Sequence, residues 1–340
     1  MSDKNIAIIG AGSWGTALAV HLSNKLKEIS LWIYENDLYE IIRTERENKW
    51  FLPGYKIPEN IKPEKSLELA VKDKSMILMA VPTPNLRKII ATLKDYIKPD
   101  TLIINASKGI EIDSLEPCHK IIHNTLSIPI KIATISGPTF AKEIANQVPS
   151  AILAASESQE TTTLIQEIFT SKNLKVFTSE DIIGVEIGGA LKNVIAIATG
   201  ISDGLGLGFN TRAALITRGL VEIARIGTML GAKPETFNGL SGLGDLVLTC
   251  TGDLSRNRQL GIKLGKGESL EIITKEMKTV AEGISTVQSA QKLIQKLNIQ
   301  ASIMEETYKV LHKNKSPKEA LGDLMKVPIS NEFSGIKGIK

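Results

Sequence analysis

The chain has 340 residues, 42% of them hydrophobic, and its 41 basic and 37 acidic residues give a formal net charge of +4. This length and composition allow a large buried core and predict two domains. The charges form no long block of one sign, which argues against nucleic-acid binding, and the mild basic excess suits an anionic small molecule better. Cys118 and Cys250 lie far apart without metal-ligand spacing, so we expect no disulfide framework, no metal site and a reducing cytoplasm.

The sequence also argues against stable membrane insertion. Three glycines and a serine interrupt the apolar stretch near the N-terminus, so this stretch lacks the uniform apolar core of a secretory signal. No later segment approaches the run of about 18 apolar residues that is needed to span a bilayer. We therefore expect a soluble protein.

A glycine fingerprint, Gly10-Ala-Gly12-Ser-Trp-Gly15, follows the apolar run 6–9 and leads into a helical pattern over residues 16–22. In such a strand-to-helix turn the first glycine permits the tight bend, the second lets the backbone approach a ligand, and the third lets the helix press on the strand. The first N–H groups of the helix then face an anion. This context predicts a pyrophosphate cradle for a dinucleotide; the alternative is an ordinary glycine-rich turn.

A second strand is predicted at 29–33, and the residues that follow it bear on the choice of cofactor. Glu35 falls twenty residues after Gly15, where an acidic side chain can bind the adenosine ribose 2′-hydroxyl, which favours NAD. Tyr34 can stack on adenine with either cofactor, and Arg46 or Lys49 can still reach a 2′-phosphate. Alternatively, Glu35 simply begins a polar turn.

Further runs rich in isoleucine and valine predict strands at 76–81, 102–105, 132–135, 151–155 and 174–177. Helical patterns at 86–93, 115–126 and 161–169 lie between them. Apolar strands that alternate with helices indicate an α/β fold with a doubly wound, mostly parallel sheet of the Rossmann type. Ligands bind beyond the carboxyl ends of such strands, which gives weight to the motifs at 81–84, 107–111 and 136–140.

From about residue 181 onward the pattern changes to long helices, at 182–201, 212–230, 270–277 and 286–297. We therefore predict a dinucleotide-binding domain over residues 1–183 and an all-α substrate and catalytic domain over 184–330, with the cofactor cleft between them. Residues 331–340 are predicted to be a poorly anchored, flexible tail.

Two lysines are candidates for chemistry. Lys108 follows a predicted strand, which places an ammonium group at the mouth of the expected cleft. Lys192 lies in the strongly apolar helical segment 184–198, where a lysine needs either a paired charge or a lowered pKa. A lowered pKa suits proton transfer near neutral pH. The alternatives are a solvated loop lysine for Lys108 and, for Lys192, a side chain that reaches water from the helix edge.

A phosphate-binding group is predicted further along the chain. Glycines precede Asp245, and the segment Ser255-Arg256-Asn257-Arg258 offers several hydrogen-bond donors suited to a phosphate dianion. These residues predict a phosphorylated substrate. The alternative is a helix N-cap at Ser255 followed by surface arginines.

Taken in order, these segments resemble the NAD(P)-dependent sn-glycerol-3-phosphate dehydrogenase family, whose members reduce dihydroxyacetone phosphate. The resemblance runs from residue 6 to about residue 290 and is carried by 10–15, 48–54, 81–84, 107–111, 137–143, 184–222, 240–261 and 280–283. The strings Gly-Ala-Leu-Lys-Asn at 189–193 and Ser-Gly-Leu-Gly-Asp at 241–245 are far more diagnostic than the glycine fingerprint. The family fold, a Rossmann-type domain followed by an all-helical domain, agrees with the pattern described above.

The resemblance implies a role for each matching residue. Dinucleotide contacts fall to Gly10, Gly12, Ser13, Trp14, Gly15, Tyr34, Lys108, Ala141, Arg256, Val280 and Glu282. Substrate contacts fall to Lys108, Gly137, Thr139, Lys192, Asp245, Ser255, Arg256 and Asn257. Lys192 matches the proton-transferring lysine, Lys108 adds electrostatic stabilisation, and Asp245 orients Lys192 or a substrate hydroxyl. Tyr34 and Glu35 lie at a variable position, so the choice between NAD and NADP stays open.

The implied reaction is hydride transfer between NAD(P)H and C2 of dihydroxyacetone phosphate, which forms sn-glycerol 3-phosphate for phospholipid synthesis. A homodimer, common in the family, is compatible with the sequence. One competing hypothesis is a dehydrogenase for 3-hydroxy acids or hydroxyacyl thioesters, which would need a carboxylate or thioester site in place of the phosphate site. Another is a redox sensor without catalysis, which has no need of a proton donor.

Overall fold

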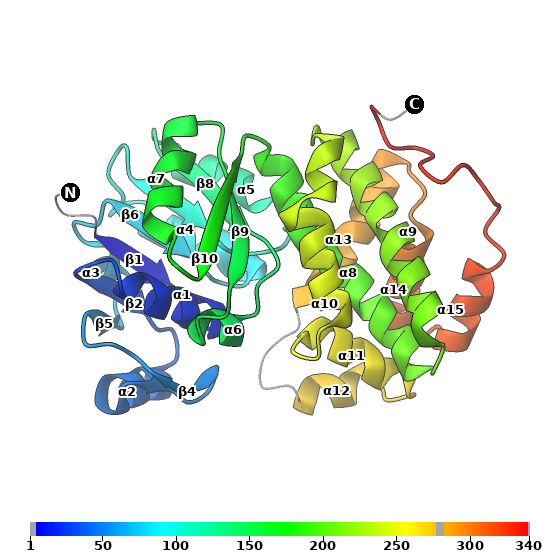
Figure 1. Ribbon diagram of the computed structural model, residues 1–340, viewed down its shortest axis with the longest axis horizontal. Coiled ribbons are helices and arrows are strands. Elements are labelled where there is room, and N and C mark those ends of the chain that lie inside the picture. Colours follow the sequence, from blue (N-terminus) through cyan, green and yellow to red (C-terminus); the bar gives the residue numbers. More distant parts are fainter. Residues whose placement is uncertain (1–4, 277–281, 339–340) are drawn as a thin grey trace. The chain divides into compact units, whose positions relative to one another are not determined.

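The computed structural model describes residues 5–276 and 282–338. The chain folds into two compact units, coloured along the sequence in Figure 1. Unit 1 comprises Met1–Ser107 and Cys118–Ile182, and unit 2 comprises Lys108–Pro117 and Ile183–Lys340.

The segment Lys108–Pro117 differs from the expected division, which kept it in the N-terminal domain. Two side chains of the helical unit donate hydrogen bonds to its backbone, Ser289 Oγ to Ile110 O at 2.7 Å and Lys292 Nζ to Ile112 O at 3.0 Å. The segment, with Lys108, therefore belongs to unit 2. Contacts between residues this far apart leave no pattern in the local sequence, so the sequence does not predict this division.

Unit 1 contains an eight-stranded sheet. Its strands are β1 (Ile6–Ile9), β2 (Ile29–Trp32), β5 (Ile61–Glu64), β6 (Met76–Met79), β7 (Leu102–Asn105), β8 (Lys131–Ser136), β9 (Ser150–Ala155) and β10 (Leu174–Ser179). They are arranged in the order β10-β9-β8-β7-β6-β1-β2-β5, and all neighbours are parallel except β8 and β9. The helices are α1 (Ser13–Ser23), α2 (Asn36–Glu45), α3 (Leu67–Val71), α4 (Thr83–Leu93), α5 (Cys118–Leu126), α6 (Ala141–Ala145) and α7 (Gln159–Phe169).

Helices cover both faces of this sheet, and for that reason the central strands are mostly apolar on both faces. Every residue of β1, β2, β6 and β7 is buried. Ile6 and Ile8 of β1 pack into one core with α1 and α7, while Ala7 and Ile9 pack into a second core with α4 and α5. The predicted doubly wound, mostly parallel sheet is therefore confirmed.

Three short strands were not predicted. Strands β3 (Glu47–Asn48) and β4 (Leu52–Lys56) form a separate antiparallel pair, and β5 lies at the outer edge of the main sheet next to β2. Pro53 and Gly54 lie within β4, and Pro63 lies within β5. Proline cannot donate to a sheet ladder and is tolerated at an edge, so these strands lack the usual sequence pattern.

Unit 2 is helical. It contains α8 (Ile182–Gly204), α9 (Gly208–Met229), α10 (Asp245–Thr251), α11 (Arg256–Gly265), α12 (Leu270–Glu276), α13 (Glu282–Leu297), α14 (Ser302–His312) and α15 (Pro317–Leu324), with a 3₁₀ turn at Pro234–Asn238 and a π-helical turn at Leu240–Gly244. Apart from one isolated bridge between Ile110 and Pro117, no strand occurs among its described residues. Helices α9, α13 and α14 pack on one another in a single core (Figure 1). The predicted all-α second part of the fold is confirmed.

The long helix α8 has the length and hydropathy of a membrane span, but 89% of its apolar window is buried inside the protein. Small residues let it pack closely on α11. A Cβ atom added at Gly200 would lie 2.1 Å from Arg258 O, and one added at Gly261 would lie 2.2 Å from Ile197 O. The backbones of these two helices are therefore in direct contact, and α8 is a core helix.

The described residues of the predicted tail, 331–338, make hydrogen bonds with α9. Arg225 of α9 donates through Nε to Ser334 O at 3.0 Å, and Arg218 donates to Glu332 O. The side chain of Ile336 is buried. Half-buried arginines on α9 thus contact the tail through backbone carbonyls, an interaction that any tail sequence can make and that its composition does not predict.

Candidate active site

The glycine fingerprint forms the turn between β1 and α1 in unit 1. Gly10 has φ +114°, and a Cβ atom there would lie 2.6 Å from Ala80 O. A Cβ atom at Gly15 would lie 2.0 Å from Gly10 O. These two glycines are required by the protein's own packing.

Gly12 is different, because a Cβ atom there would meet no described atom within 4 Å. Packing within the protein would therefore accept a side chain at this position. The open space beside Gly12 fits a bound ligand that approaches the backbone. Gly12 also precedes α1 as its N-cap without a side-chain hydrogen bond, which leaves backbone N–H groups at the helix start for an anion. The buried indole N–H of Trp14 has no hydrogen-bond partner among the described residues. The cradle therefore fits a dinucleotide diphosphate.

The other predicted dinucleotide residues lie in both units. Tyr34 follows β2 and is 72% exposed, which suits stacking on a base, and Ala141 is the first residue of α6. Arg256 and Glu282 begin helices α11 and α13 of unit 2. Val280 lies outside the described residues.

A cluster of charged side chains lies in unit 2, and we call Lys108, Lys192 and Asp245 the two-lysine site. Asp245 is fully buried and accepts from both lysines, from Lys108 Nζ at 2.7 Å through Oδ2 and from Lys192 Nζ through Oδ1. Lys192 is 6% exposed. Two ammonium groups face one carboxylate here, and Glu282, whose carboxyl pKa is raised by burial, interacts electrostatically with both lysines. The ammonium groups favour an anionic ligand and can stabilise negative charge on a bound oxygen.

Local structure explains how Asp245 comes to face Lys192. A Cβ atom at Gly188 of α8 would lie 2.8 Å from Ser241 O, so the π-helical turn Leu240–Gly244 lies directly against α8 one turn before Lys192. Asp245 is the first residue of α10, immediately after that turn. The positive end of the α10 dipole stabilises its carboxylate.

Burial lowers the pKa of Lys192 to about 8, well below its ordinary value. The Asp245 carboxylate opposes this shift, and the Lys108 ammonium reinforces it. A lysine with such a pKa can both donate and accept a proton close to neutral pH.

The sequence analysis did not single out Thr249, whose hydroxyl completes the surroundings of Lys192. Lys192 Nζ donates to Thr249 Oγ1 at 2.9 Å, and Thr249 Oγ1 donates to Asp245 O at 2.6 Å. The four-residue spacing between Asp245 and Thr249, which puts both on one face of α10, was the available signal.

The predicted phosphate-binding segment lies at the start of α11. Ser255 is the N-cap, and its Oγ accepts from Arg258 N at 3.2 Å, as the alternative interpretation of this segment predicts. Asn257 is also engaged, because its Oδ1 accepts from Gly283 N at 3.1 Å. Arg256 is exposed and interacts electrostatically with Glu282, whose carboxyl pKa is raised by burial.

Arg258 does not contribute to a fork of phosphate donors. It is 8% exposed and forms ion pairs with Asp203 at 2.8 Å and Asp253 at 2.9 Å. Asp203 also pairs with Arg212 at 2.7 Å. Arg258 therefore joins α11 to the end of α8.

Gly137 and Thr139, which the sequence analysis assigned to the substrate, lie in unit 1 just after β8. Gly137 has φ +142°, and Thr139 Oγ1 donates to Gly137 O at 3.2 Å. The other six predicted substrate residues belong to unit 2.

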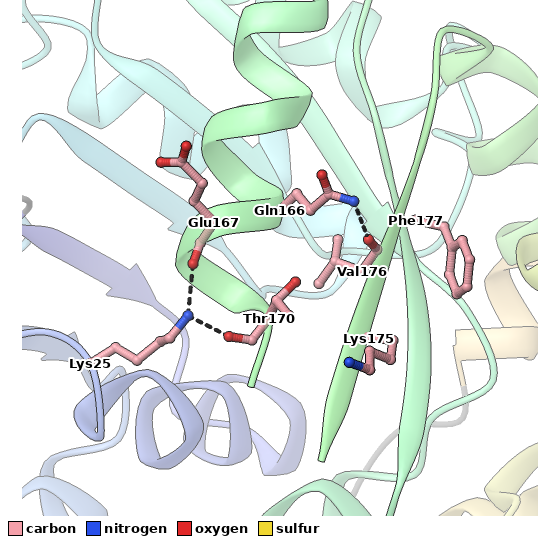
Figure 2. A pocket seen from close by; sticks show the side chains of 7 residues that line it. All are labelled: Lys25, Gln166, Glu167, Thr170, Lys175, Val176 and Phe177. Atoms are coloured by element: carbon pink, nitrogen blue, oxygen red, sulfur yellow. Dashed lines mark hydrogen bonds between the residues drawn. The ribbon is translucent and has the colours of Figure 1, made fainter. Parts of the chain in front are cut away.

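A surface hollow of about 540 Å³ on unit 1 is lined by side chains that make hydrogen bonds within the fold. Figure 2 shows Lys25 Nζ donating to Glu167 O at 2.7 Å and to Thr170 O, and Gln166 Nε2 donating to Val176 O at 2.6 Å. These bonds satisfy carbonyls at the C-terminal end of α7 and on the edge strand β10. No predicted site residue lines the hollow. Elsewhere in the described chain, no group of three histidine, cysteine, aspartate or glutamate residues could hold a metal ion.

A mostly parallel sheet with a glycine-rich turn that fits a diphosphate, in one chain with a helical unit that holds a buried lysine of lowered pKa, is typical of a dinucleotide-dependent oxidoreductase. The comparisons narrow this class. The model of the NAD-dependent glycerol-3-phosphate dehydrogenase N-terminus matches residues 5–162, and that of its C-terminus matches residues 181–322. The chain therefore belongs to the NAD-dependent glycerol-3-phosphate dehydrogenase family.

Individual relatives agree with this family. The chain is 48% identical over 328 residues to a glycerol-3-phosphate dehydrogenase [NAD(P)+] from Citrifermentans bemidjiense, covering 96% of this chain and 97% of the relative. It is 46% identical to one from Geobacter sulfurreducens, with the same coverage. A crystal structure of glycerol-3-phosphate dehydrogenase from Coxiella burnetii superimposes with a TM-score of 0.93 at 38% identity, covering 95% of this chain and 99% of that one. The predicted family, enzyme class and NAD(P) cofactor are confirmed.

Proposed function

We propose that this enzyme interconverts dihydroxyacetone phosphate and sn-glycerol 3-phosphate, with Lys192 as the general acid and base. The observation that carries the proposal is the two-lysine site, in which Lys108 and Lys192 both bind the buried Asp245. A three-carbon phosphate ester can contact both ammonium groups at once, because one carboxylate holds them together.

A dinucleotide held by the glycine fingerprint 10–15 would supply the hydride chemistry at C2 of the triose. In the direction of reduction, negative charge grows on the C2 oxygen, and Lys192 as an ammonium group donates the proton that this oxygen needs. Lys108 stabilises the same charge electrostatically, and Asp245 fixes both lysines in place. A positioned acid of this kind contributes about 10²- to 10⁴-fold to the rate. In the direction of oxidation, neutral Lys192 takes the hydroxyl proton.

The start of α11 supports a phosphate site. Arg256 is exposed there, and the N-terminus of this ten-residue helix favours an anion. We assign the substrate phosphate to Arg256 with Ser255 and Asn257, and we assign Gly137 and Thr139 of unit 1 to further substrate contacts. Binding energy from the phosphate aligns C2 for reaction, so this remote group raises turnover as well as affinity.

The dinucleotide contacts follow from the cradle in unit 1. We assign the diphosphate to Gly10, Gly12, Ser13, Trp14 and Gly15, which surround the start of α1. The remaining proposed contacts of the dinucleotide are Tyr34, Ala141, Lys108, Arg256, Val280 and Glu282.

We also propose a cytoplasmic location, a role of the product in phospholipid synthesis and a homodimeric assembly. Burial of α8 within the protein and the two free, buried cysteines support a location where thiols stay reduced. The phospholipid role follows from the product, since glycerol phosphate is the backbone of these lipids. The homodimer rests on the family alone, and sedimentation of the purified enzyme tests it.

The experiment that tests the reaction is a set of NADH oxidation assays with four substrates. Dihydroxyacetone phosphate should be reduced, whereas dihydroxyacetone, which lacks the phosphate, should react far more slowly at saturation and with a higher KM. Two 3-oxo acids serve as substrates of the competing dehydrogenase class. Activity on the 3-oxo acids without activity on dihydroxyacetone phosphate would overturn the proposal.

A further inference from the structure

The carboxyl end of β2 meets the carboxyl end of β5, and this places Lys65 beside Tyr34. The two strands are parallel with Trp32 opposite Glu64, and Ile33 N donates to Glu64 O at 3.0 Å. Trp32 Nε1 donates to Lys65 O at 3.0 Å, which fixes the backbone of Lys65 against β2. Lys65 therefore lies at the sheet edge where the adenosine ribose of a dinucleotide binds.

The side chain of Lys65 turns back over the end of β2. Its Nζ donates to Ile33 O at 3.3 Å and to Tyr34 O, and it lies 5.8 Å from the centroid of the Tyr34 ring. An ammonium group has three N–H donors, so these two carbonyls leave one donor for a ligand. The two bonds also hold the charge at this place, which reduces the entropy lost when an anion binds.

The two other cations considered for this role are held elsewhere. Arg46 donates to Ile57 O at 3.2 Å, to Ile61 O at 2.8 Å and to Pro58 O, so its guanidinium group closes the loop before β5. Lys49 forms an ion pair with Glu45 one helical turn away. Lys65, in contrast, contacts the end of β2 through the carbonyls of Ile33 and Tyr34.

Glu35 provides the opposite charge at the same strand end. It is the N-cap of α2, and its side chain makes no capping hydrogen bond. A carboxylate in this position accepts from a ribose 2′-hydroxyl and repels a 2′-phosphate. The adenosine end of the cofactor site therefore combines a carboxylate that favours NAD with an ammonium group that favours NADP.

We propose that Lys65 binds the 2′-phosphate and thereby determines how well this enzyme accepts NADP(H) beside NAD(H). The inference rests on dinucleotide binding by unit 1 and is independent of the chemistry at the two-lysine site. Its readout is therefore affinity, measured without turnover.

The test compares wild type, Lys65→Met and Lys65→Arg by fluorescence titration with NADPH and NADH and by calorimetry with adenosine 2′,5′-bisphosphate. Loss of one charge-assisted hydrogen bond predicts a rise of about tenfold in the Kd of Lys65→Met for NADPH and for the bisphosphate. Its Kd for NADH should stay within about twofold, and Lys65→Arg should retain NADPH binding. Lys62→Met is the matched control, because it removes an exposed charge from β5 and should change none of these values.

The alternatives give different results. If Lys65 only supports the end of β2, Lys65→Met weakens NADH and NADPH alike, which overturns the proposal. An unchanged Kd for NADPH overturns it as well. A wild-type protein that binds neither dinucleotide contradicts the cofactor cradle itself, so that result is distinguishable from failure of the Lys65 assignment.

Discussion

At the residue scale, the account depends on one carboxylate that serves two lysines. Asp245 is fully buried, and without Lys108 and Lys192 its charge would be expensive to bury. The reverse also holds, because removal of Asp245 would leave two ammonium groups facing each other. The three side chains therefore stabilise one another. We expect the pH dependence of the site to follow the protonation of Lys192, whose pKa is lowered.

A first prediction concerns the pH dependence of turnover. Because Lys192 is the proposed proton donor of the reduction and its pKa is about 8 without ligand, kcat/KM for dihydroxyacetone phosphate should stay level below pH 8 and fall about tenfold per pH unit above it. The proposed oxidation of glycerol 3-phosphate needs the neutral amine, so its kcat/KM should rise through the same pH. Steady-state rates at saturating cofactor between pH 6 and pH 10 measure both limbs.

Thr249 supplies the control for this profile. Its hydroxyl proton is donated to Asp245 O, so a lone pair faces Lys192 Nζ and favours the ammonium form. Thr249→Val should therefore move both limbs to lower pH, and Thr249→Ser should keep the wild-type profile. Limbs that stay in place in Thr249→Val would exclude this role for the hydroxyl.

Much of this site could be predicted from single residues. Lys192 is conspicuous in a largely apolar helix, Lys108 follows a predicted strand, and Asp245 follows a glycine-rich string of a known family. Their convergence leaves no local pattern, because Asp245 is 53 residues from Lys192 and 137 residues from Lys108 along the chain, and only the family resemblance implied it. The pairing of Arg258 with Asp203 was hidden for the same reason.

At the element scale, the position of α11 is fixed by backbone contact with α8. Gly200 and Gly204 of α8 lie opposite Gly261 and Gly265 of α11, with the Cα atom of each facing glycine 2.9 Å from the ideal Cβ position. Since α11 begins at Arg256, this contact also determines where the proposed phosphate residues lie.

A second prediction follows for the stability of this helix pair. Gly200→Ala would place a methyl group 2.1 Å from Arg258 O, so the helices must separate, and the free energy of unfolding should fall by about 1–3 kcal/mol or more. Gly322→Ala in α15 is the matched control, because its Cβ meets no described atom within 4 Å. The control should be neutral or stabilised by up to about 1 kcal/mol. Urea unfolding measures both, and equal stability of the two variants would refute the contact.

Elements were predicted best where burial dictates their composition. The central strands and α8 are mostly apolar because they are buried, and they occur where the sequence places them. Strands β4 and β5 contain proline or glycine and few apolar residues, because they lie at edges where tertiary pairing outweighs local preference.

At the scale of the whole molecule, the two units contribute different kinds of electrostatic interaction to the proposed function. In the proposed function, unit 1 binds an anionic diphosphate through backbone N–H groups and a helix dipole, while the buried side-chain charges of unit 2 serve proton transfer. Segments that cross this division escaped prediction, as Lys108–Pro117 shows, because their place depends on contacts distant in sequence. Residues 331–338 lie within unit 2, and their contacts with α9 are likewise distant in sequence.

The measurement that tests the central claim most directly is turnover of Lys192→Ala with dihydroxyacetone phosphate, made beside an NADH titration of the same preparation. The account predicts that kcat falls by about 10²- to 10⁴-fold while the Kd for NADH stays within about twofold of wild type, because the cradle lies in unit 1 and the proton donor in unit 2. Turnover close to that of wild type, with NADH bound normally, would contradict it.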